Sequence, residues 1–199
     1  MNIPPLGLEG DLMVPEDASG VVLFAHGSGS SRLSPRNRQV AETLQQNGLA
    51  TLLMDLLSPD EDQRFNIELL SARLIHAVDW LAQEASTARL RLGLFGASTG
   101  AAAALVTAAR RPDNVRAVVS RGGRPDLAGA ALSLVDAPTL LIVGGRDSTV
   151  IDLNRRAFEQ LRCDKDIHIV PGATHLFEEP GTLEKVSDLA QDWFLTYLH

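Results

Sequence analysis

A tight turn with the pattern G-x-S-x-G, residues 96–100, constrains the fold of this chain more than any other segment. An apolar run over 90–95 precedes the turn, and four alanines, 101–104, follow it. The first segment predicts a buried strand and the second a helix, so the turn must join the two within a few residues. Such a turn strains its central residue, and glycine at both ends makes room for it. We therefore expect Ser98 to stand exposed over the amino end of a helix, which is the setting of a serine nucleophile.

Strands and helices are expected to alternate along the chain. Continuous apolar runs predict strands buried on both faces, and apolar residues at helical spacing predict the helices between them. The predicted strands cover 6–14, 21–26, 50–54, 90–95, 115–120, 140–143 and 166–170, and the predicted helices cover 35–47, 64–85, 99–110, 125–133, 150–161 and 182–198. An acidic loop is expected over 55–63, and it contains Pro59 and Asp60. This order predicts an α/β fold with a mostly parallel sheet of about seven strands and helices on both faces.

Length and composition narrow the class of protein. A chain of 199 residues predicts one domain, 1–199. The formal net charge of −7 and the lack of a basic cluster argue against a nucleic-acid surface. No apolar run is long enough to cross a bilayer, and no signal peptide is visible at the start. We expect a cytoplasmic protein with a small-molecule substrate, no nucleic-acid or membrane partner, no cofactor and no metal. The oligomeric state, a homodimer included, stays open.

Two later loops supply residues that would activate a serine. Asp147 follows the predicted strand 140–143, and His175 follows 166–170, so both should meet Ser98 at the carboxyl edge of a parallel sheet. An acid and a base in this order predict an aspartate that orients a histidine, which in turn takes the serine proton. Asp147 could instead cap the helix near 150 or sit in a turn, and Asp126 and Asp152 are the reserves for the acid. His26 ends a buried strand and is expected to be a hydrogen-bonded structural residue.

Two further features concern the substrate. An oxyanion hole needs two backbone N–H groups, and we expect them from Thr99, which follows the nucleophile, and from Ser28, with Gly29 as the alternative. Arg121 and Arg124 leave a strand beside the expected site. Either arginine could hold a substrate carboxylate, or both could lie on a solvated loop beside an acidic residue.

These segments resemble the α/β-hydrolase superfamily, in particular the small dienelactone-hydrolase-like group, over about residues 18–198. The resemblance rests on His26-Gly27-Ser28-Gly29, the turn at 96–100, Gly145-Arg146-Asp147 and Gly172-Ala173-Thr174-His175. Similar small hydrolases occur beside or fused to phosphoribosyltransferase domains. Dienelactone hydrolases usually have a cysteine nucleophile, so the serine here favours ordinary ester hydrolysis.

The resemblance implies a serine carboxylesterase that hydrolyses small, short-chain esters through an acyl-enzyme, with Ser98, Asp147 and His175 as its catalytic triad. The connection 121–139 has room for one short helix and no large lid, which favours short acyl groups. Two alternatives are a dienelactone-hydrolase-like lactonase and a non-catalytic, partner-binding protein of the same fold.

Overall fold

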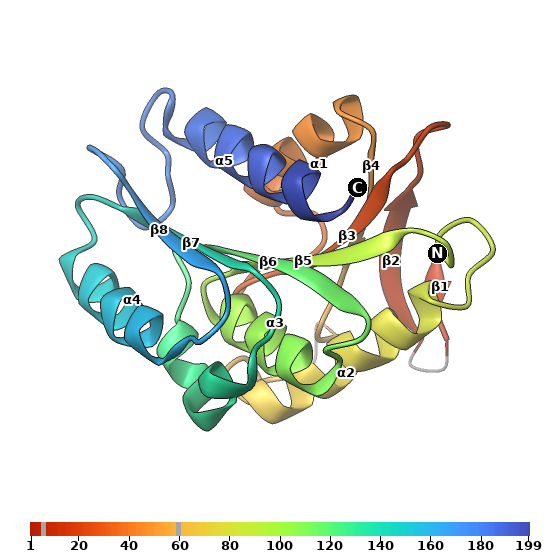
Figure 1. Ribbon diagram of the computed structural model, residues 1–199, viewed down its shortest axis with the longest axis horizontal. Coiled ribbons are helices and arrows are strands. Elements are labelled where there is room, and N and C mark those ends of the chain that lie inside the picture. Colours follow the sequence, from red (N-terminus) through yellow and green to blue (C-terminus); the bar gives the residue numbers. More distant parts are fainter. Residues whose placement is uncertain (5–6, 59–60) are drawn as a thin grey trace.

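The computed structural model describes residues 1–4, 7–58 and 61–199. Pro59 and Asp60 of the acidic loop lie outside the described residues, as does residue 6 at the start of the first predicted strand. The described residues form one sheet with the strand order β1-β2-β4-β3-β5-β6-β7-β8, covered by helices on both faces (Figure 1). The strands are β1 Asn2–Ile3, β2 Leu8–Met13, β3 Gly20–Ala25, β4 Leu49–Met54, β5 Arg91–Ala97, β6 Val115–Arg121, β7 Thr139–Gly144 and β8 Lys165–Val170.

Helices follow most of the strands, as the sequence predicts. The helices of the described residues are α1 Pro35–Gln46, α2 Ile67–Leu81, α3 Thr99–Arg110, the 3-10 helix η1 Pro125–Leu134, α4 Ser148–Gln160 and α5 Thr182–Tyr197. The predicted helix 64–85 is shorter at both ends. It begins after Asn66, whose side chain accepts a hydrogen bond from the Leu69 N–H and so caps the helix.

The sheet is mostly parallel, and this confirms the predicted α/β class. Strands β3 to β8 pair in parallel, whereas β1 and β2 are antiparallel additions at one edge. The sheet has eight strands where about seven are expected, because Asn2–Ile3 pairs with β2. None of the described helices is long and apolar enough to cross a membrane.

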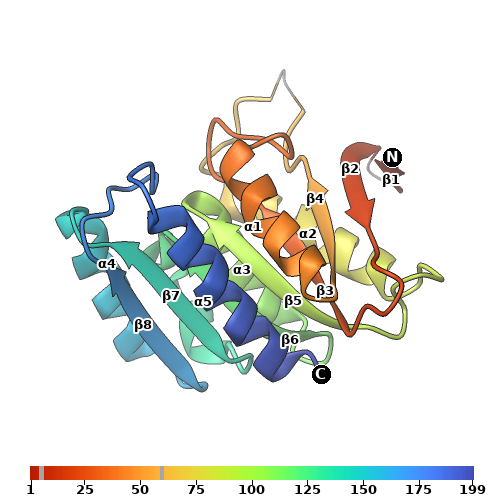
Figure 2. The ribbon, with the colours of Figure 1, turned by 90° about the horizontal axis from the view of Figure 1, so that it is seen from above.

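Two apolar layers hold the helices to the sheet. Successive residues of β3 alternate between them: Val21 and Leu23 pack with α2 and α3, while Val22 and Phe24 pack with α1 and α5. Figure 1 shows α1 and α5 on one face and α2, α3 and α4 on the other. Figure 2 shows that the loops after β3, β4 and β8 all lie at one edge of the sheet. That edge is where the candidate residues gather.

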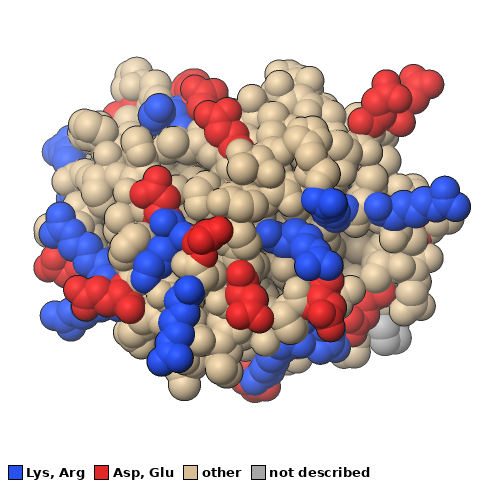
Figure 3. Space-filling model, in the orientation of Figure 1, with Lys and Arg blue, Asp and Glu red and all other residues tan. Residues whose placement is uncertain are grey.

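Charged side chains of both signs are mixed on the face shown in Figure 3. Among the described residues, Arg110 pairs with Glu68 at 2.8 Å and Arg111 with Asp79 at 2.9 Å. These pairs join α2 to α3 at the surface, where each contributes little to folding.

Candidate active site

Ser98 has the strained backbone that the turn predicts. Its φ and ψ are 51° and −122°, in a region that L-residues rarely adopt. The turn is tight because β5 runs straight into α3: a Cβ added at Gly96 would lie 2.4 Å from the Ala101 Cα, and one at Gly100 would lie 2.2 Å from the Ala25 carbonyl oxygen. The Ser98 side chain is half-buried and makes no capping hydrogen bond within the described residues. Its hydroxyl is therefore available for chemistry.

His175 and Asp147 are in direct contact. The His175 Nδ1 lies 2.7 Å from the Asp147 Oδ2. Because a carboxylate can only accept at neutral pH, Nδ1 carries the proton, and Nε2 is left with a free lone pair. Asp147 also stands at the N-cap of α4, but within the described residues its side chain makes no capping bond. The contact with His175 favours the catalytic interpretation of Asp147 over the capping one.

The histidine loop lies beside the serine turn. The Ser98 N–H donates to the Arg121 carbonyl oxygen at 3.3 Å, which ties the turn to the end of β6. A Cβ added at the next residue, Gly122, would lie 3.6 Å from the His175 Cε1. The imidazole thus sits over the strand end that the serine turn contacts. Arrangements of this kind allow a histidine to act as the base for a serine.

A hydrogen bond and a buried aromatic residue hold the histidine loop, residues 171–181, in place. The Glu179 carboxylate accepts a hydrogen bond from the Thr174 N–H at 3.0 Å, and this bond holds the pKa of Glu179 below its usual value. Phe177 is buried with a φ of 55°, the second strained non-glycine residue in the described part of the chain. Strain that the surrounding packing maintains is common where a side chain must be held in place.

The reserve acid Asp126 has a different partner. Both of its carboxylate oxygens accept hydrogen bonds from Arg124, at 2.9 and 2.8 Å. This ion pair occupies the guanidinium of Arg124, the group that was expected to be able to bind a substrate carboxylate. Asp126 is therefore the less suitable acid, and the Arg124 role in substrate binding stays a prediction.

Arg121 is buried rather than displayed. It is 7% exposed, and its Nη2 donates to the Asn37 Oδ1 of α1 at 3.2 Å. Burial lowers its pKa to about 10, so it is still charged at neutral pH. A contact between Arg121 and a substrate stays a prediction. In the structure the Arg121 side chain is buried and packs against α1.

His26 has the structural role that the sequence indicates. Its Nε2 accepts a hydrogen bond from the Leu56 N–H at 2.9 Å, and its Nδ1 lies 2.9 Å from the Gly27 carbonyl oxygen. Since the N–H can only donate and the carbonyl can only accept, the ring is neutral with its proton on Nδ1. Burial lowers the pKa of His26. The ring joins the loop after β3 to the loop after β4.

The two expected oxyanion donors lie together, with a contact that the sequence did not indicate. Thr99 is the first residue of α3, where a helix leaves its N–H groups unpaired. The Ser28 N–H donates to the Thr99 Oγ1 at 3.0 Å. The loop approaches this closely because Gly27 has no side chain: a Cβ there would lie 2.9 Å from the Ser98 Cβ. Thr99 thereby fixes the direction of the Ser28 N–H.

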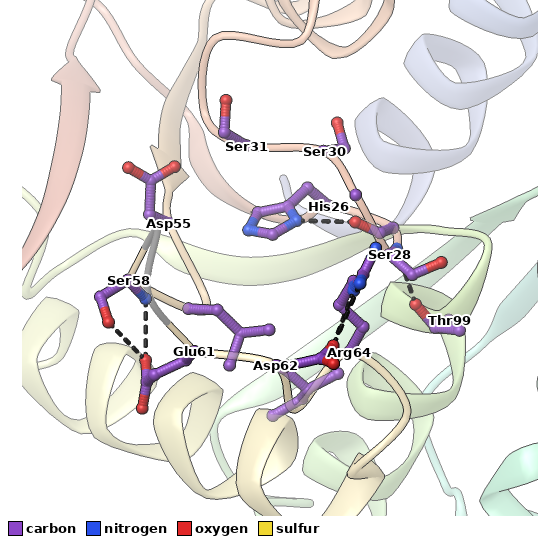
Figure 4. A pocket seen from close by; sticks show the side chains of 14 residues that line it. His26, Ser28, Ser30, Ser31, Asp55, Ser58, Glu61, Asp62, Arg64 and Thr99 are labelled. Atoms are coloured by element: carbon purple, nitrogen blue, oxygen red, sulfur yellow. Dashed lines mark hydrogen bonds and ion pairs between the residues drawn. The ribbon is translucent and has the colours of Figure 1, made fainter.

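A cavity of about 470 Å³ opens beside these donors (Figure 4). The glycine-rich loop after β3 forms one wall, and the acidic loop after β4 forms the other. Arg73 of α2 holds the second wall by donating to the Leu56 carbonyl oxygen at 2.6 Å and to both Glu61 carboxylate oxygens. These hydrogen bonds lower the pKa of Glu61 to about 2. Sequence patterns indicated an acidic loop here, but not that it folds back over the strand edge.

Comparisons with known proteins agree with this fold. The model of the dienelactone hydrolase family matches residues 8–193. A dienelactone hydrolase structure from Anabaena variabilis is 57% identical, with a TM-score of 0.97, and the match covers 100% of this chain and 95% of that one. Est1E from Butyrivibrio proteoclasticus has a TM-score of 0.84 over 98% of this chain and 97% of its own, and at 18% identity it supports the fold alone.

Longer relatives are also found. Two Mycobacterium tuberculosis proteins, from strains CDC 1551 and H37Rv, have names that describe a phosphoribosyl transferase. Each is 60% identical over 198 residues, which are 98% of this chain and 45% of the relative. The chain thus spans about half the length of the curated relatives that it matches.

The buried His26 should make folding depend on pH. Its pKa is lowered in the folded protein, so the unfolded chain binds the proton more tightly. We expect the free energy of unfolding to be highest above pH 6.5 and to fall as the pH drops through 6.5 toward the folded pKa. The fall is at most about 1.4 kcal/mol for each pH unit, the slope for a difference of one bound proton between the two states.

Urea unfolding at pH 7.5, 6.0 and 5.0 measures this dependence. In His26→Gln, whose amide oxygen can replace Nε2 as acceptor, the dependence should shrink. In His76→Gln, an exposed site on α2, it should persist. Equal slopes in all three proteins would contradict the assignment.

The Thr99 hydroxyl should matter for turnover. Thr99→Val keeps the shape of the side chain but removes the bond that holds the Ser28 backbone beside the serine turn. Because the oxyanion donor is then less well positioned, kcat for p-nitrophenyl acetate should fall about tenfold or more with little change in KM. Thr99→Ser, which keeps the hydroxyl, should restore most of the rate. A Thr99→Val protein faster than wild type would show instead that the hydroxyl competes with the substrate for the Ser28 N–H.

Proposed function

The chain belongs to the dienelactone hydrolase family, and we propose that it is a serine carboxylesterase that hydrolyses small, short-chain esters. The observation that carries the proposal is a strained, half-buried Ser98 at the same sheet edge as a histidine that Asp147 orients at 2.7 Å. The family and its structural neighbours support a hydrolase; the serine nucleophile and the ester substrate are our inference.

In the proposed mechanism His175 Nε2 takes the proton of Ser98 as the hydroxyl attacks the ester carbonyl. Asp147 keeps the imidazole in the required tautomer and stabilises its positive charge. The Thr99 N–H binds the oxyanion, and the Ser28 N–H joins it by exchanging its bond to the Thr99 hydroxyl for one to the oxyanion. His175 then protonates the departing alcohol. A water molecule, activated by the same histidine, hydrolyses the acyl-enzyme and restores Ser98.

A lactonase is the second candidate. The Anabaena variabilis protein, named a dienelactone hydrolase, is 57% identical to this chain. A lactone is an internal ester, so the same serine and histidine would open it. Against a carboxylated lactone, Arg124 is paired with Asp126 and Arg121 is buried. A non-catalytic, partner-binding role predicts that Ser98 does not react, and this distinguishes it from both enzymes.

Loss of Ser98 should abolish the activity. Ser98→Ala is expected to reduce hydrolysis of p-nitrophenyl acetate about 10⁴-fold, because the serine and histidine act as a unit. A fluorophosphonate should label wild type with one equivalent and leave Ser98→Ala unlabelled. Asp147→Asn should be clearly impaired, whereas Asp126→Asn, the matched control, should stay close to wild type. The reverse result for the two aspartates would move the acid to Asp126, and an unlabelled wild type would favour the partner-binding role.

Short acyl chains should be preferred. The connection between β6 and β7 holds only the 3-10 helix η1 and offers little apolar wall. Each extra methylene is worth about 0.8 kcal/mol only where the protein buries it. In a series of p-nitrophenyl esters from acetate to palmitate, kcat/KM should fall beyond about eight carbons, without a jump in rate above the micelle concentration. A maximum at the long esters would contradict the proposal.

A further inference from the structure

We infer that the cavity beside Ser98 is an acyl site that selects short, uncharged acyl groups carrying a hydroxyl. This inference rests on the proposed esterase function and adds the substrate class. It follows from three observations: the side of Ser98 on which the cavity lies, the oxygen atoms that line it, and the charges that are already paired around it.

The cavity lies on the side of Ser98 that faces away from the histidine. Its walls are the loops after β3 and β4, whereas Asp147 and His175 follow β7 and β8. Strand β5, which leads to Ser98, stands between these two groups in the sheet. In the tetrahedral intermediate, the leaving oxygen must face His175 and the oxyanion must face the N–H donors. The remaining substituent, the acyl chain, is directed toward the cavity.

Polar side chains share the cavity lining with apolar surface. Figure 4 shows the side chains of Ser30, Ser31, Asp55 and Ser58 around it. The Asp55 oxygens accept from the Arg32 N–H at 2.7 Å and from the Arg32 Nη1 at 2.6 Å, and each oxygen keeps a further lone pair. A hydroxyl on the acyl chain can donate to such a carboxylate and can accept from a serine.

An alkyl chain would contact only the apolar part of this lining favourably. Leu57 and Leu70 are the apolar side chains of the wall. Burial against them stabilises a methylene, whereas a methylene that removes water from a hydroxyl or carboxylate leaves that group without a partner. An acyl group with its own hydroxyl replaces the lost water. The lining therefore favours a hydroxylated chain over an alkyl chain of the same length.

An anionic acyl group is disfavoured by the paired charges. The three carboxylates of the wall belong to Asp55, Glu61 and Asp62, and each is bound to one arginine. Arg64 is the cation in the lining itself, and its guanidinium is held by Asp62 at 3.1 Å. A substrate carboxylate that approached this guanidinium would face Asp62 as well as the other two acids. An uncharged acyl group avoids this repulsion.

Three methyl esters with four-carbon acyl chains test the inference: methyl butyrate, methyl 3-hydroxybutyrate and monomethyl succinate. Hydrolysis is followed by pH-stat titration, and each kcat/KM is divided by the rate of hydroxide-catalysed hydrolysis of the same ester. We expect the hydroxybutyrate ester to exceed the butyrate ester by about tenfold, the worth of one hydrogen bond to a charged group. The succinate ester should be the slowest of the three.

Variants connect this preference to the cavity. Asp55→Asn should reduce the ratio of hydroxybutyrate to butyrate several-fold. Asp62→Asn, at an exposed site, should raise the relative rate of the succinate ester. Asp136→Asn, exposed beyond η1 and away from the cavity, is the matched control and should change neither ratio.

Each outcome separates the inference from the function on which it rests. Fluorophosphonate labelling of Ser98 with turnover of methyl butyrate, but no preference for the hydroxylated ester, overturns the acyl site and leaves the esterase standing. A succinate ester that is fastest, with its advantage lost in Arg64→Ala, overturns the inference in favour of an anion site. No labelling and no turnover of any ester overturns both.

Discussion

The backbone of Ser98 is the constraint on which the remaining geometry depends. A φ of 51° at a non-glycine residue is unfavourable by roughly 1–3 kcal/mol and persists only where packing enforces it. The enforcement is visible at Gly96 and Gly100, where an added Cβ would lie 2.4 and 2.2 Å from backbone atoms of Ala101 and Ala25. The start of α3 is thus pressed against the end of β3. The same contact brings the glycine-rich loop after β3 within reach of the serine.

Hydrogen bonds extend this order to both sides of the serine. On one side, His26 joins the loop after β3 to Leu56, and this link shapes the cavity. On the other side, Asp147 holds His175, whose loop is braced by Glu179. The carboxylates of the cavity are bound by arginines, whereas Asp147 is bound by the histidine. Acidic residues near the serine therefore fall into two groups: those that bind arginines around the cavity, and Asp147, which binds the histidine.

Local patterns in the sequence were sufficient to predict the serine turn, because glycine, a strand and a helix all lie within a few residues of Ser98. The strand order brought His175 and Asp147 to the same edge, and the structure confirms their contact. The sequence favoured Asp147 as the acid, but its pattern did not exclude Asp126, because both follow a strand and both precede a helix. The choice depends on Arg124, which folds back onto Asp126 two residues away.

The cavity and the burial of Arg121 escaped prediction for a different reason. Both depend on contacts between segments far apart in the chain. Arg121 ends a strand at a polar edge of the sheet, where an exposed side chain is expected. Instead it donates a hydrogen bond to Asn37 of α1, which lies 84 residues earlier in the chain. The acidic loop becomes a wall only because Arg73, a turn and a half into α2, reaches back to Leu56 and Glu61. Neither partner can be identified from composition or periodicity.

The cavity and His175 lie on opposite sides of Ser98, and this placement would help the second half of the proposed reaction, the hydrolysis of the acyl-enzyme. The alcohol leaves on the His175 side, and the acyl group stays in the cavity on the other side of Ser98. The vacated space borders His175, which is 41% exposed, so water can enter where the alcohol left and be activated there. A large lid would hinder this exchange, and the short connection around η1 leaves the histidine side open. An acyl group anchored by hydrogen bonds can therefore keep its carbonyl in the oxyanion hole through both steps without a cover over the site.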